Sequence, residues 1–376
     1  MGKIKIACLQ YFFILFLLPF SIKAQHEEHK TLEIGAAAPD FSLKSIDGKM
    51  YSLASFKAAD LLVIVFTCNH CPTAQAYEDR VIQLTKDYKD KGVAVVAIMP
   101  NDPTSVQLSE LGYTDMGDTY EEMKLRAAQK HFNYPYLYDG ETEAISKLYG
   151  PIATPHAFVF DKSRKLRYSG RIDNIEKPTK TPTSFDLRNA IDALLQNKDV
   201  AVQTTKVFGC SIKWAEKSDW ITKAKIEWAK EAVALDTIGE AGIKTLLANY
   251  SDSVRVIAVW ATGSASSVAE FPDFIEANRM YRKRNFEFIT ISTDKPGDKA
   301  KALQFLKEQE ASNTNYIVNG GSYKLVPAIT TSGHGAMPII IIVSPGGKIT
   351  YRHEGPIKAA ELKKLIVEDP AIGRYY

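Results

Sequence analysis

The sequence predicts an α/β protein with two successive domains, each with a central mixed sheet and helices on both faces. Apolar, β-branched runs at residues 61–66 and 93–99 alternate with segments of helical spacing. The second half repeats this plan, with apolar runs at 254–260 and 286–292. The length of 376 residues is sufficient for two domains.

The composition is that of an ordinary globular protein. Hydrophobic residues make up 45% of the chain, charged residues make up 24%, and the formal net charge is +3. This balance indicates neither a nucleic-acid partner nor a membrane partner. Four cysteines are present, and the one at position 8 falls in the N-terminal segment described next.

The N-terminus has the pattern of a secretory signal peptide. Two lysines precede an apolar run at 11–20 and a short segment that ends at Ala24. We therefore expect a signal peptide at 1–24, cleavage near Ala24, and secretion across the inner membrane to the periplasm. A retained N-terminal anchor is the alternative, and only then would the protein have a membrane partner. Residues 25–31 are expected to form a solvated tail.

The stretch 61–72, L-L-V-I-V-F-T-C-N-H-C-P, indicates the chemistry of the first half. Cys68 and Cys71 form a C-x-x-C pair between the apolar run and a segment, 73–88, that can be helical. Such a pair at a strand-to-helix junction is typical of a thioredoxin-like dithiol. Unpaired N–H groups and the helix dipole stabilise a thiolate there. We expect Cys68 to lie at this helix end as the nucleophile and Cys71 to close the disulfide.

His70 stands between the two cysteines. As an imidazolium it would stabilise the Cys68 thiolate and make the pair more oxidising. The alternative is a solvent-facing histidine with little effect. Zinc is not indicated because no second cysteine pair completes a tetrahedral set, and haem is not indicated because Pro72 follows Cys71. We expect no metal and no cofactor.

The other elements of the first half follow in chain order. The Asp47-Gly48 pair between two alternating runs predicts a hairpin turn. Strands are predicted at 136–138, from 153 to 161 with a proline near its head, and at 166–169. Helical spacing predicts helices at 120–131, 142–149 and 185–196.

Residues 32–202 resemble the redoxin branch of the thioredoxin superfamily, which includes AhpC/TSA peroxiredoxins and TlpA/ResA-like thiol oxidoreductases. The matching stretches are A-P-D-F-S-L, D-G-K-M-Y-S-L, F-T-C-N-H-C-P and T-P-H-A-F-V-F-D. The resemblance implies that Thr154 and Pro155 form the cis-proline loop, which faces the dithiol and pairs with a substrate strand. It also implies protein thiols and disulfides as substrates, together with a redox partner that the sequence does not identify.

The second half, 221–376, resembles the same fold without its thiols. The stretch A-T-G-S-A-S-S-V-A-E-F-P resembles W-A-T-W-C-G-P-C-R-A-E-M-P of TlpA-like proteins, with Ser264 and Ser267 at the two cysteine positions. Met337 and Pro338 take the cis-proline position. Because a serine hydroxyl cannot form a disulfide, we expect a degenerate site. This half would then be a binding or docking module, or a scaffold that only covers the first.

A connector at 203–220 joins the halves, and its aromatic residues indicate that it is structured. Cys210 within it has two interpretations. It is either a third redox thiol that reaches the dithiol when the connector folds back, or a small buried hydrophobe. His156 and His334 lie near the expected sites of their halves, and both are expected to be packing or loop residues.

Two alternative functions stay open. A thiol-dependent peroxidase would carry P-x-x-x-T-x-x-C, but Cys68 stands where that threonine should be. No clear counterpart exists for the peroxidase arginine among Arg126, Arg164, Arg167 and Arg171. A non-catalytic interaction protein would instead hold Cys68 and Cys71 in a structural disulfide. The enzyme interpretation requires that the two sulfurs be reachable and lie beside the proline-headed loop.

Overall fold

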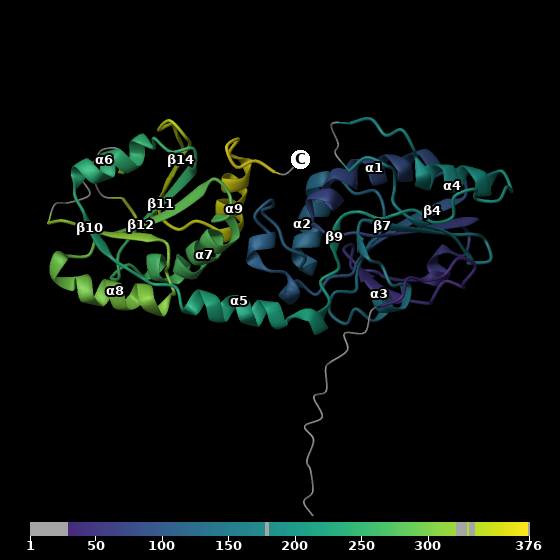
Figure 1. The fold of residues 1–376 in the computed structure, drawn as a ribbon, viewed down its shortest axis with the longest axis horizontal. Helices are drawn as coiled ribbons and strands as arrows, with labels where there is room; N and C mark the ends of the chain where they lie inside the picture. Colours follow the sequence, from purple (N-terminus) through teal and green to yellow (C-terminus); the bar gives the residue numbers. More distant parts are fainter. Residues whose placement is uncertain (1–28, 177–179, 321–328, 331–334, 375–376) are drawn as a thin grey trace, which may run out of the picture.

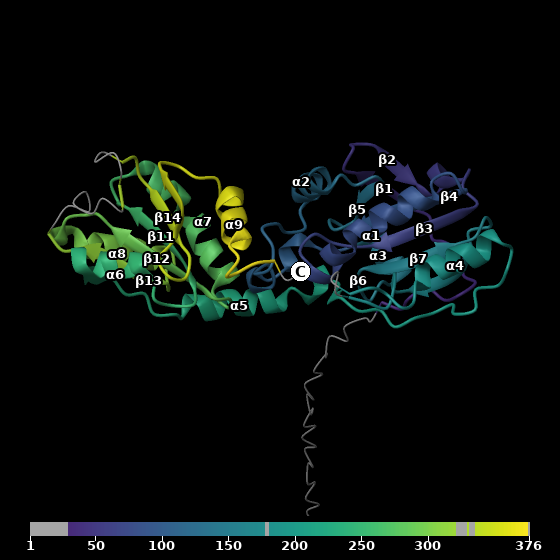
Figure 2. The same cartoon turned by 90° about the horizontal axis from the view of Figure 1, so that it is seen from above.

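The computed structural model describes residues 29–176, 180–320, 329–330 and 335–374, so the expected signal peptide lies outside the described residues. Two α/β domains lie side by side along the long axis of the molecule, with helix α5 (Asp219–Ala229) running between them (Figure 1). A view from above shows the same two lobes (Figure 2). The predicted fold class is confirmed.

The first domain contains a seven-stranded mixed sheet of order β2-β1-β5-β4-β3-β7-β8. Its strands are β1 (Ser42–Ser45), β2 (Met50–Ser52), β3 (Leu61–Phe66), β4 (Val93–Met99), β5 (Tyr136–Tyr138), β7 (His156–Phe160) and β8 (Leu166–Gly170). Its helices are α1 (Pro72–Tyr88), α2 (Tyr120–Lys130), α3 (Ala144–Tyr149) and α4 (Asp186–Leu195), with short 3-10 turns η1 (Leu53–Phe56), η2 (Pro103–Ser105) and η3 (Leu108–Glu110). The predicted hairpin joins β1 to β2, and Gly48 adopts the positive φ of +81° that its turn requires.

The second domain contains a six-stranded sheet of order β10-β13-β12-β11-β14-β15. Its strands are β10 (Asp236–Ile238), β11 (Val254–Trp260), β12 (Phe286–Ser292), β13 (Thr314–Val318), β14 (Ile339–Val343) and β15 (Ile349–Glu354). Its helices are α6 (Glu240–Ala248), α7 (Ala265–Tyr281), α8 (Lys299–Glu308) and α9 (Ala359–Glu368), with a 3-10 turn η5 (Pro296–Asp298). No helix in the described part of the chain is long and apolar enough to cross a membrane.

The central strand β3 explains why its sequence is apolar without alternation. All six of its residues are buried, because both faces of the sheet are covered. Leu61, Val63 and Val65 pack with helices α1 and α4, whereas the intervening residues pack on the opposite side with α3 and the aromatic residues of β7. The dithiol therefore follows directly after a strand that is packed on both of its faces.

The two domains share the arrangement around their central strands. β3 pairs in parallel with β4 and antiparallel with β7, which continues antiparallel to β8. β11 likewise pairs in parallel with β12 and antiparallel with β14, which continues antiparallel to β15. Cis peptide bonds precede β7 and β14, at Thr154–Pro155 and Met337–Pro338. The repeated plan read from the sequence is thus present in the topology.

The connector between the domains is structured and returns to the first one. Its strand β9 (Cys210–Ser211) pairs antiparallel with β6 (Ala153–Thr154), and the 3-10 turn η4 (Ala215–Lys217) follows. His29, from the expected tail, lies with its Nε2 2.7 Å from Oε1 of Glu216 and its ring against Trp214. This end of the tail is therefore held by the connector.

Residues 101–118, between β4 and α2, reach from the first domain to the second. Val106 and Leu111 are buried in the core of the second domain, and η3 packs on α7. The Tyr281 hydroxyl donates a hydrogen bond to the carbonyl oxygen of Thr114 at 2.8 Å. This bridging segment, as we call residues 101–118, ties the two cores together.

Candidate redox site

The two cysteines of the C-x-x-C pair lie between the end of β3 and the start of α1. Cys71 is the N-cap of α1, and Pro72 occupies the first helical position, where a missing N–H costs little. The expectation that Cys68 lies at the helix start is wrong, because Cys68 precedes the N-cap by three residues. The favourable end of the helix dipole is therefore at Cys71.

Both sulfurs lie against the loop that the sequence singled out. The Sγ of Cys68 is 3.0 Å from the Thr154 hydroxyl oxygen, and the Sγ of Cys71 is 3.4 Å from the Thr154 carbonyl oxygen. Thr154 is joined to Pro155 by one of the two cis bonds. The structure thus brings together Cys68, Cys71 and the proline-headed loop, although they are more than 80 residues apart in sequence.

The dithiol is not accessible to water in this conformation. Cys68 is 2% exposed and Cys71 is fully buried. The connector strand β9 lies against the site, with Cys210 paired to Thr154 and its backbone N–H donating to the Sγ of Cys71 at 3.3 Å. The expectation of reachable sulfurs is therefore wrong for the structure as it stands, and the connector strand is one element that packs over them.

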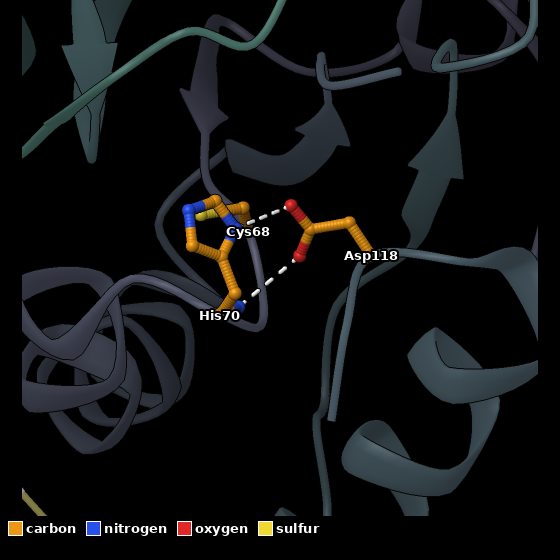
Figure 3. Close-up of side chains that lie close together, drawn as sticks. All are labelled: Cys68, His70 and Asp118. Atoms are coloured by element: carbon orange, nitrogen blue, oxygen red, sulfur yellow. Dashed lines mark hydrogen bonds and ion pairs between the residues drawn. The ribbon is translucent and has the colours of Figure 1, made fainter. Parts of the chain in front are cut away.

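His70 is buried and paired with Asp118, as Figure 3 shows. The His70 Nδ1 lies 2.6 Å from Oδ2 of Asp118. The Oδ1 of the same carboxylate accepts the backbone N–H groups of Asn69 and His70, and Oδ2 also accepts the side-chain amide of Asn101 at 2.7 Å. The interpretation of His70 as a solvent-facing side chain is therefore wrong. The sequence analysis missed both Asp118 and Asn101.

The ion pair sets the charges of its two members. Burial lowers the pKa of His70, but the charge of Asp118 and the hydrogen bond to it outweigh burial, so the pKa is raised. Burial raises the pKa of Asp118, but the imidazolium charge and the donated hydrogen bonds lower it overall. The pair is thus an imidazolium and a carboxylate over a wide pH range.

The two cysteines are shifted in opposite directions. Burial raises the pKa of Cys68, and its hydrogen bond with Cys71 and the charge of Asp118 raise it further. Burial also raises the pKa of Cys71, but hydrogen bonds from Cys210 and Cys68 and the charge of His70 take it well below its ordinary value. The imidazolium therefore favours a thiolate at Cys71, whereas the sequence analysis expected it to act on Cys68.

Cys68, His70 and Asp118 also offer ligand atoms that lie within 4.8 Å of one another, close enough to bind one metal ion. The hydrogen bonds argue against this use. Both carboxylate oxygens of Asp118 already accept two donors each. Among the described atoms, the Nε2 of His70 has no hydrogen-bond partner, and it is the one ring nitrogen left for a ligand. The arrangement fits an ion pair beside a thiol better than a metal centre.

Two further histidines, His156 and His334, are expected near the sites of the two halves, and the structure describes only the first. His156 is buried, and its Nε2 lies 3.0 Å from the Ser169 hydroxyl oxygen. Burial lowers its pKa to about 3, so it is neutral, which fits the expected packing role. His334 lies outside the described residues.

The matching position in the second domain holds hydroxyl groups. Ser264 is the N-cap of α7 and accepts the backbone N–H of Ser267, and the Oγ atoms of these two serines are 3.0 Å apart. The cis Met337–Pro338 loop lies beside them, but Ser266, between the two expected positions, makes the contact, donating to the Met337 carbonyl oxygen at 2.7 Å. The second site thus places hydroxyl groups beside a cis-proline loop, but its N-cap is the first of the two positions, Ser264, whereas the N-cap of the first site is the second, Cys71.

Comparison with known proteins places the first domain in a family context. Residues 34–169 match the AhpC/TSA family. Thiol-disulfide oxidoreductase ResA of Bacillus thuringiensis subsp. konkukian is 27% identical over 141 residues, which cover 37% of this chain and 70% of ResA. The thioredoxin-like protein YneN of Bacillus subtilis is 27% identical over 161 residues, which cover 43% and 81%. Hypothetical protein SMc02350 from Sinorhizobium meliloti 1021, which has a crystal structure, is 33% identical in sequence. The match covers 50% of this chain and 97% of that protein's chain, with a TM-score of 0.45.

Proposed function

Residues 34–169 belong to the AhpC/TSA redoxins of the thioredoxin superfamily, and from this premise we propose that the protein is a thiol–disulfide oxidoreductase that uses Cys68 and Cys71. One observation carries the proposal. Two free thiols with oppositely shifted pKa values lie beside Thr154, and one of them, Cys71, is the N-cap of α1. A low-pKa thiolate next to a second thiol is the arrangement that disulfide exchange needs.

The reaction proceeds by two exchanges. Because both sulfurs are buried, direct attack by Cys71 requires the connector strand β9 to move off the site. The Cys71 thiolate then attacks one sulfur of a substrate disulfide, and the other substrate sulfur leaves as a thiolate. Cys68 then loses its proton and attacks the Sγ of Cys71, which forms the Cys68–Cys71 disulfide and releases the second substrate thiol. The substrate gains two electrons and the dithiol loses two. In the reverse direction the disulfide oxidises a substrate dithiol.

The attacking sulfur in this scheme is the one that the sequence analysis assigned to resolution. The position of Cys71 at the N-cap and its lowered pKa support this exchange of roles. Trapping separates the two assignments. We expect Cys68→Ser combined with Cys210→Ser, which removes both neighbouring thiols, to accumulate a mixed disulfide with a substrate on Cys71. Accumulation in Cys71→Ser alone would restore the original assignment to Cys68.

The activity itself is tested on the purified full chain with a small disulfide substrate. We expect Cys71→Ser, and Cys68→Ser combined with Cys210→Ser, each to lose the complete reduction cycle, because in neither can Cys71 form a disulfide with a second cysteine of the site. Ser267→Ala in the second domain is the matched control and should retain the wild-type rate. A double cysteine variant that reduces the substrate as fast as wild type would overturn the proposal.

The two alternatives are separated by other observations. A merely structural disulfide would have a reduction potential below about −300 mV, whereas an exchanging pair would lie above it. For a peroxidase, an arginine near the thiols should be available for the peroxide. Arg126, the buried candidate, instead donates two hydrogen bonds to Glu78, at 2.8 and 2.7 Å. Arg164 binds backbone carbonyl oxygens, while Arg167 and Arg171 pair with Asp161 and Asp186.

The cellular setting belongs to the same proposal. Export through a signal peptide at 1–24 would place the dithiol among protein thiols and disulfides of the periplasm, where disulfides persist. Determining the N-terminal residue of the mature protein tests this directly, with cleavage near Ala24 as the expected result. An intact Met1 would favour the retained anchor. In the same proposal, the second domain is a docking module that carries out no disulfide exchange of its own.

A further inference from the structure

The connector strand β9 is fitted closely to the dithiol site. Its backbone pairs with Ala153 and Thr154, and Phe208, just before it, packs on the ring of Tyr77 in α1. Gly209 has a φ of +142°, and a Cβ atom at this position would lie 2.0 Å from the carbonyl oxygen of Thr154. Only glycine allows so close an approach without a shift of the backbone. The glycine at position 209 therefore allows the backbone to place Cys210 beside the dithiol.

Cys210 lies against the sulfur of Cys71. Its backbone N–H donates to the Cys71 Sγ at 3.3 Å. The thiols of Cys210 and Cys68 are both close enough to Cys71 to lower its pKa. The three thiols thus form a series with Cys71 in the middle.

Exposure changes along this series. Cys68 and Cys71 are buried, whereas Cys210 is half-buried. A protein substrate that approaches the closed site therefore meets Cys210 before it can meet either member of the C-x-x-C pair. A half-buried thiol beside a buried one is the arrangement of a relay, and a packing role alone does not explain the hydrogen bond from Cys210 to the Cys71 sulfur.

We propose that Cys210 is a third redox thiol that forms a disulfide with Cys71 and passes oxidising equivalents between the buried pair and protein substrates. This inference rests on the proposed function. It assigns a reacting role to a residue outside the C-x-x-C motif.

The step conserves atoms and electrons. Starting from the Cys68–Cys71 disulfide, the Cys210 thiol loses its proton and its sulfur attacks the Sγ of Cys71. The Cys71–Cys210 bond forms as the Cys68–Cys71 bond breaks, and the electron pair of the broken bond remains on Cys68, which takes up a proton. One disulfide is exchanged for another within the chain, so no further oxidant is needed. A substrate thiolate then attacks the half-exposed Cys210 sulfur.

Disulfide mapping in the full chain tests the proposal. Wild type, Cys68→Ser and Cys68→Ser with Ser211→Ala are oxidised with oxidised glutathione, and the linked peptides are identified by mass spectrometry. We expect the Cys71–Cys210 disulfide in both variants. Ser211→Ala is the control substitution, because Ser211 is an exposed neighbour of Cys210 and its loss should not affect the sulfurs. Cys68→Ser that keeps both thiols, while wild type forms Cys68–Cys71, would overturn this inference alone. Wild type that forms neither bond would overturn the proposed function as well.

A second variant tests the close approach of β9 to the site and leaves Cys71 and Cys210 in place. Gly209→Ala must move β9 away from the Thr154 carbonyl, so we expect at least about tenfold less Cys71–Cys210 product in a Cys68→Ser background. The Cys68–Cys71 disulfide should still form when Gly209→Ala is made alone. We also expect Cys210→Ser to reduce protein disulfides at least about tenfold more slowly than wild type. Equal rates on the protein disulfide would contradict the relay.

Discussion

The Nδ1 of His70 lies 2.6 Å from the Oδ2 of Asp118, and both side chains are buried next to the dithiol. Asp118 ends the bridging segment, residues 101–118, whose middle is packed in the core of the second domain. A carboxylate, an imidazolium and a thiolate thus follow one another from this segment to the start of α1. The charge state of Cys71 therefore depends on a residue 47 positions away in the sequence.

Replacing the carboxylate should weaken the Cys71 thiolate. In Asp118→Asn the pKa of His70 falls, since the charge that raises it is gone, and a neutral imidazole no longer lowers the pKa of Cys71. We expect the apparent thiol pKa to rise, so that less thiolate is present at any pH below that pKa. Thiolate absorbance during a pH titration measures this. Asp115→Asn is the control, because Asp115 pairs with Arg374 outside the site; identical titrations of wild type and Asp118→Asn would contradict the assignment.

The same ion pair gives a defined pH dependence of stability. The raised pKa of His70 means that its contribution is complete below pH 6.5 and is lost as pH rises through the folded value. The lowered pKa of Asp118 means that its contribution is present above pH 3.8 and is lost as pH falls through the folded value. We expect His70→Gln to lower the free energy of unfolding most between pH 3.8 and 6.5, by about 3–5 kcal/mol as for a broken buried pair.

Denaturant unfolding at several pH values checks this dependence, and His156→Gln serves as the comparison. The pKa of His156 is lowered to about 3, so the wild-type protein loses its contribution as pH falls below 6.5. The stability difference between wild type and this variant should therefore shrink toward acidic pH, the opposite trend. A His70→Gln difference that is constant with pH would show that the pKa of His70 is not raised in the folded protein.

The serine pair of the second domain should accept a disulfide. Because the Oγ atoms of Ser264 and Ser267 are 3.0 Å apart, we expect Ser264→Cys with Ser267→Cys to lose two hydrogens on mild oxidation. Peptide mass mapping detects the new bond, and the single variant Ser264→Cys is the control. Two persistent free thiols under conditions that oxidise Cys68 and Cys71 would show that the second site has lost the geometry as well as the sulfur.

Gly112 should be a sensitive point of the contact between the domains. A Cβ atom here would lie 2.8 Å from the backbone carbonyl oxygen of Met280 in α7, and the carbonyl of Gly112 accepts a hydrogen bond from Arg284 at 2.6 Å. We expect Gly112→Ala to lower the free energy of unfolding by about 1–3 kcal/mol. Gly297→Ala, at a glycine with open space around it, is the control. Equal effects of the two substitutions would mean that the docking of this turn is not needed for stability.

The parts of the structure that the sequence predicted are those with local patterns. The apolar run of β3, the Asp47-Gly48 hairpin and the helices α2 and α4 follow from periodicity and turn residues. The serines beside the Met337–Pro338 loop follow from a motif at a strand-to-helix junction. Each of these features is decided by residues close together in the chain, so one sequence is sufficient to find them.

The parts that were missed depend on contacts between distant residues. Asp118 captures the backbone N–H groups of Asn69 and His70, so α1 begins only at Pro72 and Cys71, not Cys68, becomes the N-cap. No motif marks an aspartate that lies in a long segment between β4 and α2. Strand β9 has two residues and therefore no periodicity that a sequence could reveal. The burial of the dithiol followed from contacts of this kind.

The bridging segment makes the serine-bearing half part of the redox centre. A chain shortened to the first domain would leave Val106 and Leu111 in water, without the side chains of α7 and its neighbours that now surround them. The turn that carries Asp118 would lose the anchor at its other end, and the imidazole would lose the fixed carboxylate that charges it. A half with no cysteine of its own thereby influences the acidity of a thiol in the other half, which is a physical reason for the two to remain one polypeptide.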